Sequence, residues 1–364
     1  MAITERYVTT TGAGLHDGTS EANAFDWAEM VTDLNTPRVG YRYNVKQGTY
    51  SLSATTTLTG DGTTTSPNVI RGYATNIGDA TLGRLSNGQL DTSKMPTLEY
   101  GSTFRLNASG ADHIILEALI VTATAANVGG ISLSNTAFCF NCHVTNNGTS
   151  GTFGIEGGQI TSEVNCCDVY VPAGGASSVG INAAGGVRNC RVKCNDGAGM
   201  RANDATNIIG NTIYECERGI NVTAGRTDIA NNTIHGCTGD GIRVTSNTSV
   251  SRIDGNHITS NGGWGINFVT STSAKFLTNN RFRNNTSGTI TGDGDFGIAT
   301  NQLNYTAGTS DDTEDYNDPT NDTYALKSTA VGYQKGLANL SNIGANGTPA
   351  STGGGGAKSY SFGL

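Results

Sequence analysis

The chain has 364 residues, a net charge of −8, 14 % charged residues, 51 glycines and only 6 prolines. The low fraction of charged residues argues against intrinsic disorder, and the absence of a three-residue glycine period excludes collagen. The sequence contains no cluster of Lys and Arg that would indicate nucleic acid or an anionic membrane surface as a partner. No apolar run approaches the roughly 18 residues of a membrane span. The composition is that of a turn-dense protein whose core is assembled from many short pieces.

Residues 1–40 predict an N-terminal segment that closes one end of the molecule. The first residues contain no basic stretch followed by an apolar one, so we expect no secretory signal and synthesis in the cytoplasm. In Ser20–Leu34, apolar residues such as Phe25 and Met30 alternate with acidic ones. This pattern predicts a short amphipathic capping helix, with Thr19 or Ser20 as its N-cap.

A repeat begins after a less regular region, in which we expect strands near Tyr43–Tyr50, Asn68–Gly72 and Thr103–Leu106. A glycine followed by an aliphatic residue recurs through the middle of the chain, as Gly130-Ile131, Gly154-Ile155, Gly180-Ile181, Gly199-Met200, Gly219-Ile220, Gly241-Ile242 and Gly265-Ile266. Between these pairs runs a second pattern, Ile-x-x-Asn-x-Ile, in which Asn gives way to Cys toward the N-terminus. Repeats of this kind indicate a stacked architecture.

The central position of the second pattern recurs every 21–25 residues, as Ala118, Cys142, Cys167, Cys190, Asn211, Asn232, Asn256 and Asn280. The period fits three short strands and three bends, which is one coil of a parallel β-helix, and no helical periodicity lies within it. Asn tolerates left-handed backbone geometry and can hydrogen-bond its copy one coil away. We therefore expect Asn at one bend, and Gly before the aliphatic residue at a second.

With these Gly-Ile pairs and the Asn column, the chain resembles the right-handed parallel β-helix superfamily, which has the pectate-lyase-like fold. The resemblance implies an all-β right-handed parallel β-helix solenoid with coils of about 21–25 residues, a short N-terminal capping helix and an irregular C-terminal tail. The implied division is an N-terminal segment at 1–40, the β-helix at 41–300 and a tail at 301–364 that caps the last coil or contacts another chain. The superfamily includes polysaccharide lyases, hydrolases, esterases and epimerases, and also phage tailspikes.

The eight cysteines lie in columns rather than in a disulfide pattern. Cys142, Cys167 and Cys190 share the ladder position, where Cys serves as a small apolar filler. Cys216 and Cys237 form a second column and could be bridged, but without an export signal we expect reduced thiols. A zinc site at Cys139, Cys142 and the adjacent histidine is disfavoured, because strand alternation points Cys139 inward and the histidine outward.

Outward-facing columns are where chemistry is expected. The first follows the ladder by one residue, as His143, Asp168, Arg191, Thr212, Thr233, His257 and Arg281, and the second by three, as Thr145, Tyr170, Lys193, Tyr214, His235, Thr259 and Arg283. A polysaccharide lyase needs a cation to neutralise a carboxylate and a base for the C5 proton. The candidate catalytic residues are Asp168, Arg191, Lys193, Tyr214 and His235. Alternatively, these columns are an ordinary polar face in contact with solvent.

A further column follows the Gly-Ile pair and could hydrogen-bond a linear glycan. Its candidate glycan-binding residues are Glu156, Asn182, Arg201, Asn221, Arg243 and Asn267. No cofactor is expected, although Asp311, Asp312 and Asp315 in the tail offer oxygen ligands suited to Ca²⁺. A solvated acidic loop is the alternative for that stretch.

The acidic residues are scattered over different columns, and the paired aspartates of β-helix hydrolases are missing. The leading hypothesis is therefore a non-catalytic structural protein of a tailed phage, a capsid decoration or tail and spike component located in the virion. We expect it to form a homotrimer and to contact other virion proteins, with no nucleic-acid or membrane partner. The alternative is a β-helix protein that binds or degrades a host surface polysaccharide by lyase-type chemistry.

Overall fold

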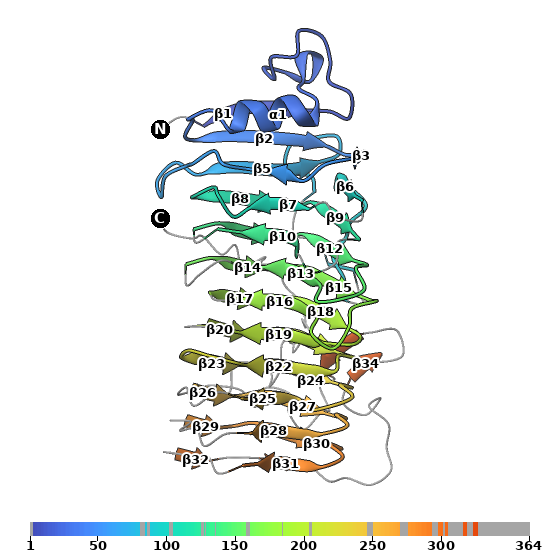
Figure 1. Cartoon of the computed structure of the whole chain (residues 1–364), viewed down its shortest axis with the longest axis vertical. Coiled ribbons are helices and arrows are strands. Elements are labelled where there is room, and N and C mark those ends of the chain that lie inside the picture. Colours follow the sequence, from blue (N-terminus) through green and yellow to red (C-terminus); the bar gives the residue numbers. More distant parts are fainter. Residues whose placement is uncertain are drawn as a thin grey trace, which may run out of the picture.

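The computed structural model describes residues 3–292 except 81–83, 86–87, 102–104, 125–126, 128, 135, 158–160, 184, 204–205, 246–249 and 270–275, and beyond them the backbone of four short strands. The strands stack as the coils of a solenoid and form three long parallel sheets (Figure 1). The predicted all-β parallel β-helix is confirmed. No helix in the described ranges is long and apolar enough to cross a membrane.

Sheet A begins at the N-terminal end of the stack and takes the first strand of each coil. Its strands are β1 (Thr4–Val8), β2 (Tyr41–Lys46), β5 (Asn68–Tyr73), β8 (Ile114–Glu117), β11 (Phe138–Phe140), β14 (Glu163–Asn165), β17 (Gly186–Arg188), β20 (Thr206–Ile209), β23 (Thr227–Ala230), β26 (Val250–Asp254), β29 (Phe276–Thr278) and β32 (Ile298–Thr300).

Sheet B follows sheet A after two residues in every coil except one, in which 23 residues separate Tyr73 of sheet A from Thr97 of sheet B. Its strands are β3 (Thr49–Leu52), β6 (Thr97–Tyr100), β9 (Ile120–Ala123), β12 (His143–Asn146), β15 (Asp168–Val171), β18 (Arg191–Cys194), β21 (Thr212–Tyr214), β24 (Thr233–His235), β27 (His257–Thr259), β30 (Arg281–Arg283) and β33 (Leu303–Asn304).

Sheet C completes each coil. Its strands are β4 (Thr56–Thr57), β7 (Leu106–Ala108), β10 (Gly129–Leu133), β13 (Phe153–Glu156), β16 (Val179–Ala183), β19 (Ala198–Ala202), β22 (Arg218–Val222), β25 (Ile242–Val244), β28 (Trp264–Phe268) and β31 (Gly288–Thr291). Later in the chain, β34 (Tyr316–Asp318) and β35 (Thr323–Leu326) form an antiparallel pair. The stack includes β1 and reaches Asn304, so it extends past both ends of the predicted 41–300 range.

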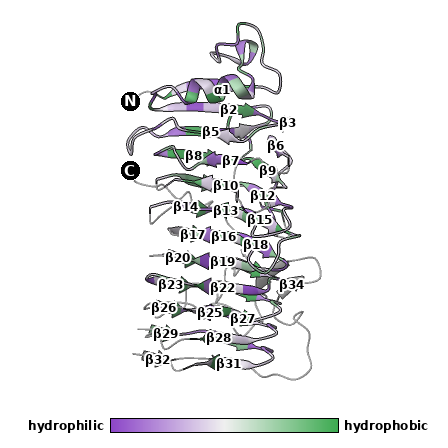
Figure 2. Ribbon diagram, in the orientation of Figure 1, coloured by the Kyte–Doolittle hydropathy of each residue, from purple (hydrophilic) through white to green (hydrophobic). Residues whose placement is uncertain are grey.

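The core is a set of aliphatic columns, one or two from each sheet. In one coil Ile229 of sheet A, Ile234 of sheet B and Ile242 of sheet C are all fully buried. Each lies in register with an aliphatic residue of the neighbouring coils. Figure 2 shows hydrophobic and hydrophilic residues mixed within the strands along the whole stack, as expected when one side of each strand faces the core.

The Asn ladder lies at the bend between sheets A and B and is fully buried. Asn232 donates through Nδ2 to Ile208 O at 2.9 Å and to Asn256 Oδ1 at 3.0 Å, and its Oδ1 accepts from the backbone N of Asn211 at 2.9 Å. The left-handed residue is not the ladder residue but the one before it, as in Asn231 with φ 55°. Both positions favour Asn, which made them indistinguishable in the sequence.

The first ladder position was assigned wrongly. His143 pairs with Ile120, which places Leu119 rather than Ala118 beside Cys142. Ala118 is instead a left-handed residue with φ 55°, equivalent to Asn141. In this coil the ladder position is Leu119 and the residue before it is Ala118. Neither is the Asn or Cys that marks the ladder in later coils, so the sequence does not fix the register here.

The glycines before the aliphatic residues are required by close approach, and they do not have positive φ. A Cβ on Gly219 would lie 2.4 Å from the carbonyl oxygen of Gly241 and 2.4 Å from Ile234 Cγ2. Glycine therefore lets sheet C begin directly against the aliphatic residues of sheet B.

The N-terminal end is covered by a 3₁₀ turn (Glu21–Asn23) and helix α1 (Trp27–Leu34), as Figure 1 shows. The N-cap is Asp26, which forms a capping box with Glu29, and not Thr19 or Ser20 as predicted. The Asp26-x-x-Glu29 spacing is the stronger cap signal, because both backbone donors are satisfied at once.

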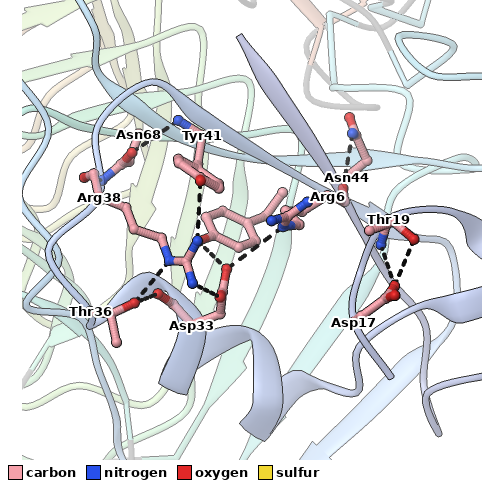
Figure 3. A network of polar contacts seen from close by, with 10 residues as sticks. Arg6, Asp17, Thr19, Asp33, Thr36, Arg38, Tyr41, Asn44 and Asn68 are labelled. Atoms are coloured by element: carbon pink, nitrogen blue, oxygen red, sulfur yellow. Dashed lines mark hydrogen bonds and ion pairs between the residues drawn. The ribbon is translucent and has the colours of Figure 1, made fainter. Parts of the chain in front are cut away.

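Ion pairs tie the cap to the first coil. Figure 3 shows the Asp33 carboxylate of α1 facing the guanidinium of Arg38, at 2.8 Å, and that of Arg6, at 3.9 Å. Asp33 also accepts a hydrogen bond from the hydroxyl of the buried Tyr43 on β2, at 2.9 Å. The helix thereby fixes the end of the stack and covers its open edge.

Candidate functional site

Strand pairing places the predicted catalytic residues in two adjacent columns on the outer side of sheet B. Asp168 lies in register with Arg191, and Tyr170 with Lys193, followed by Tyr214. Repetition of the coil therefore brings together residues that are 20 or more positions apart.

This face is not the exposed surface expected from strand alternation. Asp168, Arg191, Tyr214 and His235 are between 5 % and 7 % exposed. The alternation correctly gives the direction of the side chains, but it carries no information about segments that fold over the sheet.

One such segment is a hairpin made by the described residues 84, 85 and 88–90, in which Arg84 and Leu90 form an antiparallel bridge. It precedes β6 in the chain but reaches past β9 and β12 to β15. Asp168 accepts hydrogen bonds from Arg84 Nη1 at 2.8 Å and from the backbone N of Leu90 at 2.7 Å. Both carboxylate oxygens of Asp168 are thus used to hold the hairpin in place.

The sequence analysis missed this hairpin. Its signal was the Asn-Gly pair at 87–88 between two leucines, which is typical of a tight hairpin. Nothing in the repeat pattern indicated where the hairpin would dock, because Leu90 and Asp168 are 78 residues apart.

A pocket of about 350 Å³ remains between the hairpin and sheet B. Leu85, Gln89 and Leu90 form one wall. The sheet side includes His143, Asp168, Tyr170, Arg191, Lys193 and Tyr214. Of the five predicted catalytic residues, four line this pocket; His235 lies beside Tyr214 outside the lining and contacts Thr259 Oγ1 at 3.1 Å.

Charges in the pocket are arranged in pairs and over aromatic rings. Lys193 pairs with Glu215, and its Nζ lies 5.8 Å from the ring centroids of both Tyr170 and Tyr214. The guanidinium of Arg191 lies 4.6 Å from the Tyr214 ring centroid. Such cation–π contacts hold the cationic groups in place beside the aromatic surface.

Two pKa shifts follow from this arrangement. Burial lowers the pKa of His143, aided by the charge of Arg191 and opposed by that of Asp168, so the imidazole is neutral at neutral pH. Burial also acts to lower the pKa of Arg84, but the charge and hydrogen bond of Asp168 outweigh it and raise that pKa. Arg84 and Asp168 therefore remain an ion pair.

The predicted glycan-binding column lies on the outer side of sheet C. Register joins Glu156 to Asn182, Arg201, Asn221, Arg243 and Asn267 on successive strands from β13 to β28. All six are partly exposed. Because successive strands lie about 4.8 Å apart, the column spans roughly 24 Å.

Two arginines dominate the middle of this column. Within the described chain neither Arg201 nor Arg243 forms an ion pair, and their Nε atoms and Oδ1 of Asn221 have no hydrogen-bond partner. Burial, with a smaller effect from the neighbouring Arg218, lowers the pKa of Arg201. These three atoms are buried, and Arg201 also donates through Nη2 to Ser177 O at 3.3 Å, so the feature that suits an anionic ligand is the pair of guanidinium charges without a paired carboxylate in the described chain.

The two end residues of the column, Glu156 and Asn267, already have partners within the protein. Glu156 pairs with Arg105 at 3.6 Å, and Asn267 donates to Asp240 at 2.9 Å. Asp240 also accepts from the backbone N of Trp264 at 2.9 Å. The sequence analysis did not identify Asp240 and Trp264, which extend this face on neighbouring positions.

All eight cysteines are free, and the Cys139 and Cys167 sulfurs lie 3.8 Å apart in the core. No cluster of three or more His, Cys, Asp or Glu suited to a metal occurs among the described residues. The calcium candidates Asp311, Asp312 and Asp315 lie outside the described residues.

Comparison with known proteins identifies the architecture. A family model described as a right handed beta helix region matches residues 177–309. The solved structure of pectate lyase Pel9A aligns with a TM-score of 0.66 at 15 % identity, over 95 % of this chain and 96 % of the lyase. The chain is a right-handed parallel β-helix of the pectate-lyase-like fold.

A second solved β-helix, a mannuronic acid specific polysaccharide family 6 lyase from human gut microbiota, aligns with a TM-score of 0.51 at 13 % identity, over 88 % of this chain and 71 % of that one. No curated protein matches the β-helix in sequence. At these identities the likeness establishes the fold, and the function has to be argued from the residues on its faces.

Proposed function

We propose that this β-helix binds a linear, carboxylate-bearing polysaccharide along the outer face of sheet C. The observation that carries the proposal is the row of Arg201, Asn221 and Arg243, which is partly exposed and has no carboxylate paired with either arginine in the described chain. Of the two hypotheses from the sequence, the solved structures favour the carbohydrate-acting protein over the virion protein, since both are named as lyases.

The spacing of the row fits a polymer of acidic sugars. Arg201 and Arg243 are two coils apart, with Asn221 on the coil between them. Two strand spacings amount to about 10 Å. This is close to the repeat of two units in an extended 1→4-linked chain, so both guanidinium groups can bind carboxylates on alternate sugars while Asn221 reaches a hydroxyl.

A polysaccharide bound on this face would also have its carboxylates paired with arginines, which is a requirement of lyase-type chemistry. In β-elimination a base removes the C5 proton, the electron pair forms a C4=C5 double bond, and the C4–O bond breaks as the leaving oxygen takes a proton. Pairing a guanidinium with the sugar carboxylate stabilises the charge that develops during proton removal. Arg201 and Arg243 are the groups proposed for that role.

The experiment compares polygalacturonate with its methyl ester, a polymer of the same backbone without the charge. We expect Arg201→Met and Arg243→Met each to weaken polygalacturonate binding about 10- to 100-fold, the effect of losing one charge-assisted contact. Arg226→Met removes the same charge from an exposed turn and is the matched control. Equal binding of the methyl ester, or unchanged affinity in both variants, would overturn the proposal.

Cleavage is followed separately by the ultraviolet absorbance of the unsaturated product. Binding without new absorbance assigns the protein to carbohydrate recognition, and binding with it to a lyase. A homotrimer remains a prediction of the sequence, which analytical ultracentrifugation of the purified chain would test. The location on a virus particle remains a separate prediction.

A further inference from the structure

Trp264 is the first residue of β28, the strand that follows β25 in sheet C (Figure 1). Its side chain is partly exposed and lies one coil beyond Arg243. We propose that its indole ring is a stacking platform for a sugar unit of the bound polysaccharide that lies beyond the units held by the two arginines. This inference rests on the proposed function and adds to it the length of chain that the site binds best.

Two contacts show that Trp264 and the row of arginines share one face. Asp240 accepts hydrogen bonds from the backbone N of Trp264 and from the side chain of Asn267, which belongs to the row, at 2.9 Å each. At the other end of the row, the guanidinium of Arg201 lies 5.9 Å from the ring centroid of Phe153, the first residue of β13. The first residues of these strands therefore lie beside the row on the surface.

The indole ring is held in position before any ligand arrives. Trp264 lies in register with Gly288 of the next coil, and a Cβ on Gly288 would be 2.6 Å from Trp264 Cζ3. The ring therefore rests against backbone that carries no side chain. Together with the hydrogen bond from the backbone N of Trp264 to Asp240, this contact fixes the ring, so that stacking a ligand on it costs little conformational entropy.

The two tryptophans of the chain differ in their surroundings. Trp27 is 6 % exposed in the N-terminal cap, and its Nε1 donates to Thr56 Oγ1 at 3.0 Å. Trp264 instead remains partly exposed on a face rich in polar side chains. A large apolar ring with one polar N–H matches the apolar ring face and the hydroxyl groups of a sugar. Trp264 thus supplies the apolar contact of a site whose charged contacts are the arginines.

The strand spacing gives the length of chain that reaches the ring. Arg201 and Arg243 lie on β19 and β25, and Trp264 lies on β28, so the face from the first arginine to the ring spans three strand spacings, about 14 Å. Arginines that bind carboxylates on alternate sugars need three consecutive units. At least one further unit is required to cover the ring, so oligomers longer than a trimer should bind more tightly than the trimer does.

The test measures the affinity of the full chain for trigalacturonate and for hexagalacturonate by titration calorimetry. We expect the hexamer to bind more tightly than the trimer. Trp264→Ala should reduce the ratio of the two affinities about three- to tenfold, the loss expected for one aromatic contact, whereas Trp264→Phe should keep most of that ratio. Phe276→Ala removes an aromatic ring that is 46 % exposed on sheet A, and as the matched control it should leave the ratio unchanged.

Tryptophan fluorescence gives a second readout. Because Trp27 is buried in the cap, the emission change caused by the hexamer should come from Trp264, and it should disappear in Trp264→Ala. A wild-type affinity ratio in Trp264→Ala, or the same emission change in that variant as in the wild-type chain, would overturn the inference.

Failure of the stacking platform can be told apart from failure of the proposed function. If neither oligomer binds the wild-type chain, both proposals are overturned. If both oligomers bind and Arg243→Met weakens both, but Trp264→Ala keeps the wild-type ratio, the row on sheet C stands and only the stacking platform is overturned. The melting temperature of each variant separates a loss of binding from a loss of folding.

Discussion

The Asn ladder allows a quantitative test of the fold through Asn232→Asp. In the native chain the Nδ2 group of Asn232 donates to Ile208 O at 2.9 Å and to Asn256 Oδ1 at 3.0 Å. An aspartate oxygen in that position faces two acceptors and cannot donate to either. Asn256 Oδ1 still accepts from the backbone N of Asn232 at 3.0 Å, so Ile208 O is the acceptor that loses this donor. An unsatisfied buried acceptor costs about 1–3 kcal/mol, so the free energy of unfolding should fall by at least that amount.

The effect should depend on pH in a direction that can be worked out. An unfolded aspartate has a pKa of about 3.9, and burial beside acceptors raises the pKa of the folded form above that value. A raised folded pKa means that protonation stabilises the native state, so stability is retained below pH ~3.9 and lost as the pH rises through the folded pKa. The penalty relative to wild type should be larger at pH 8 than at pH 4.

The assay is urea unfolding of wild type and variant at both pH values, followed by far-ultraviolet circular dichroism. Asn147→Asp makes the same chemical change at an exposed position and should alter stability by less than about 0.5 kcal/mol. Wild-type stability of Asn232→Asp at pH 8, or a larger penalty at pH 4, would refute the assignment of a buried amide ladder.

Three further predictions concern packing, capping and thiol chemistry. Gly219→Ala should destabilise the chain by about 1–3 kcal/mol or more in urea unfolding, because its Cβ would meet Gly241 O and Ile234 Cγ2 at 2.4 Å, while Gly110→Ala, with no atom nearer than 3.6 Å, should cost little. Asp26→Ala should lower the melting temperature by removing about 1 kcal/mol of capping energy, whereas Ser20→Ala should not, since Ser20 makes no cap hydrogen bond. Burial raises the pKa of Cys166 to about 12, and only the thiolate reacts with an alkylating reagent. Alkylation of Cys166 at pH 9 should therefore be nearly a thousand-fold slower in the native chain than in urea. Equal rates would contradict the burial of this thiol.

The sequence alone was sufficient to predict the period of the repeat, the three strands of each coil and the residues that share each column. Stacking repeats each local environment once per coil, so the same residue type recurs at the same position and the pattern can be read directly. The register Asn211–Asn232–Asn256–Asn280 and the columns through Asp168 and Arg201 all follow from that repetition.

Only the tertiary structure decided what covers the faces and which of two adjacent polar residues makes the bend. The hairpin that engages Asp168 comes from a segment 78 residues earlier, and its docking depends on Arg84 meeting a carboxylate several coils away. Similarly, Asn231 and Asn232 are equivalent in sequence, and only the backbone assigns φ 55° to the first and the buried ladder to the second. Repetition reveals contacts between equivalent positions, whereas a contact made once leaves no period in the sequence.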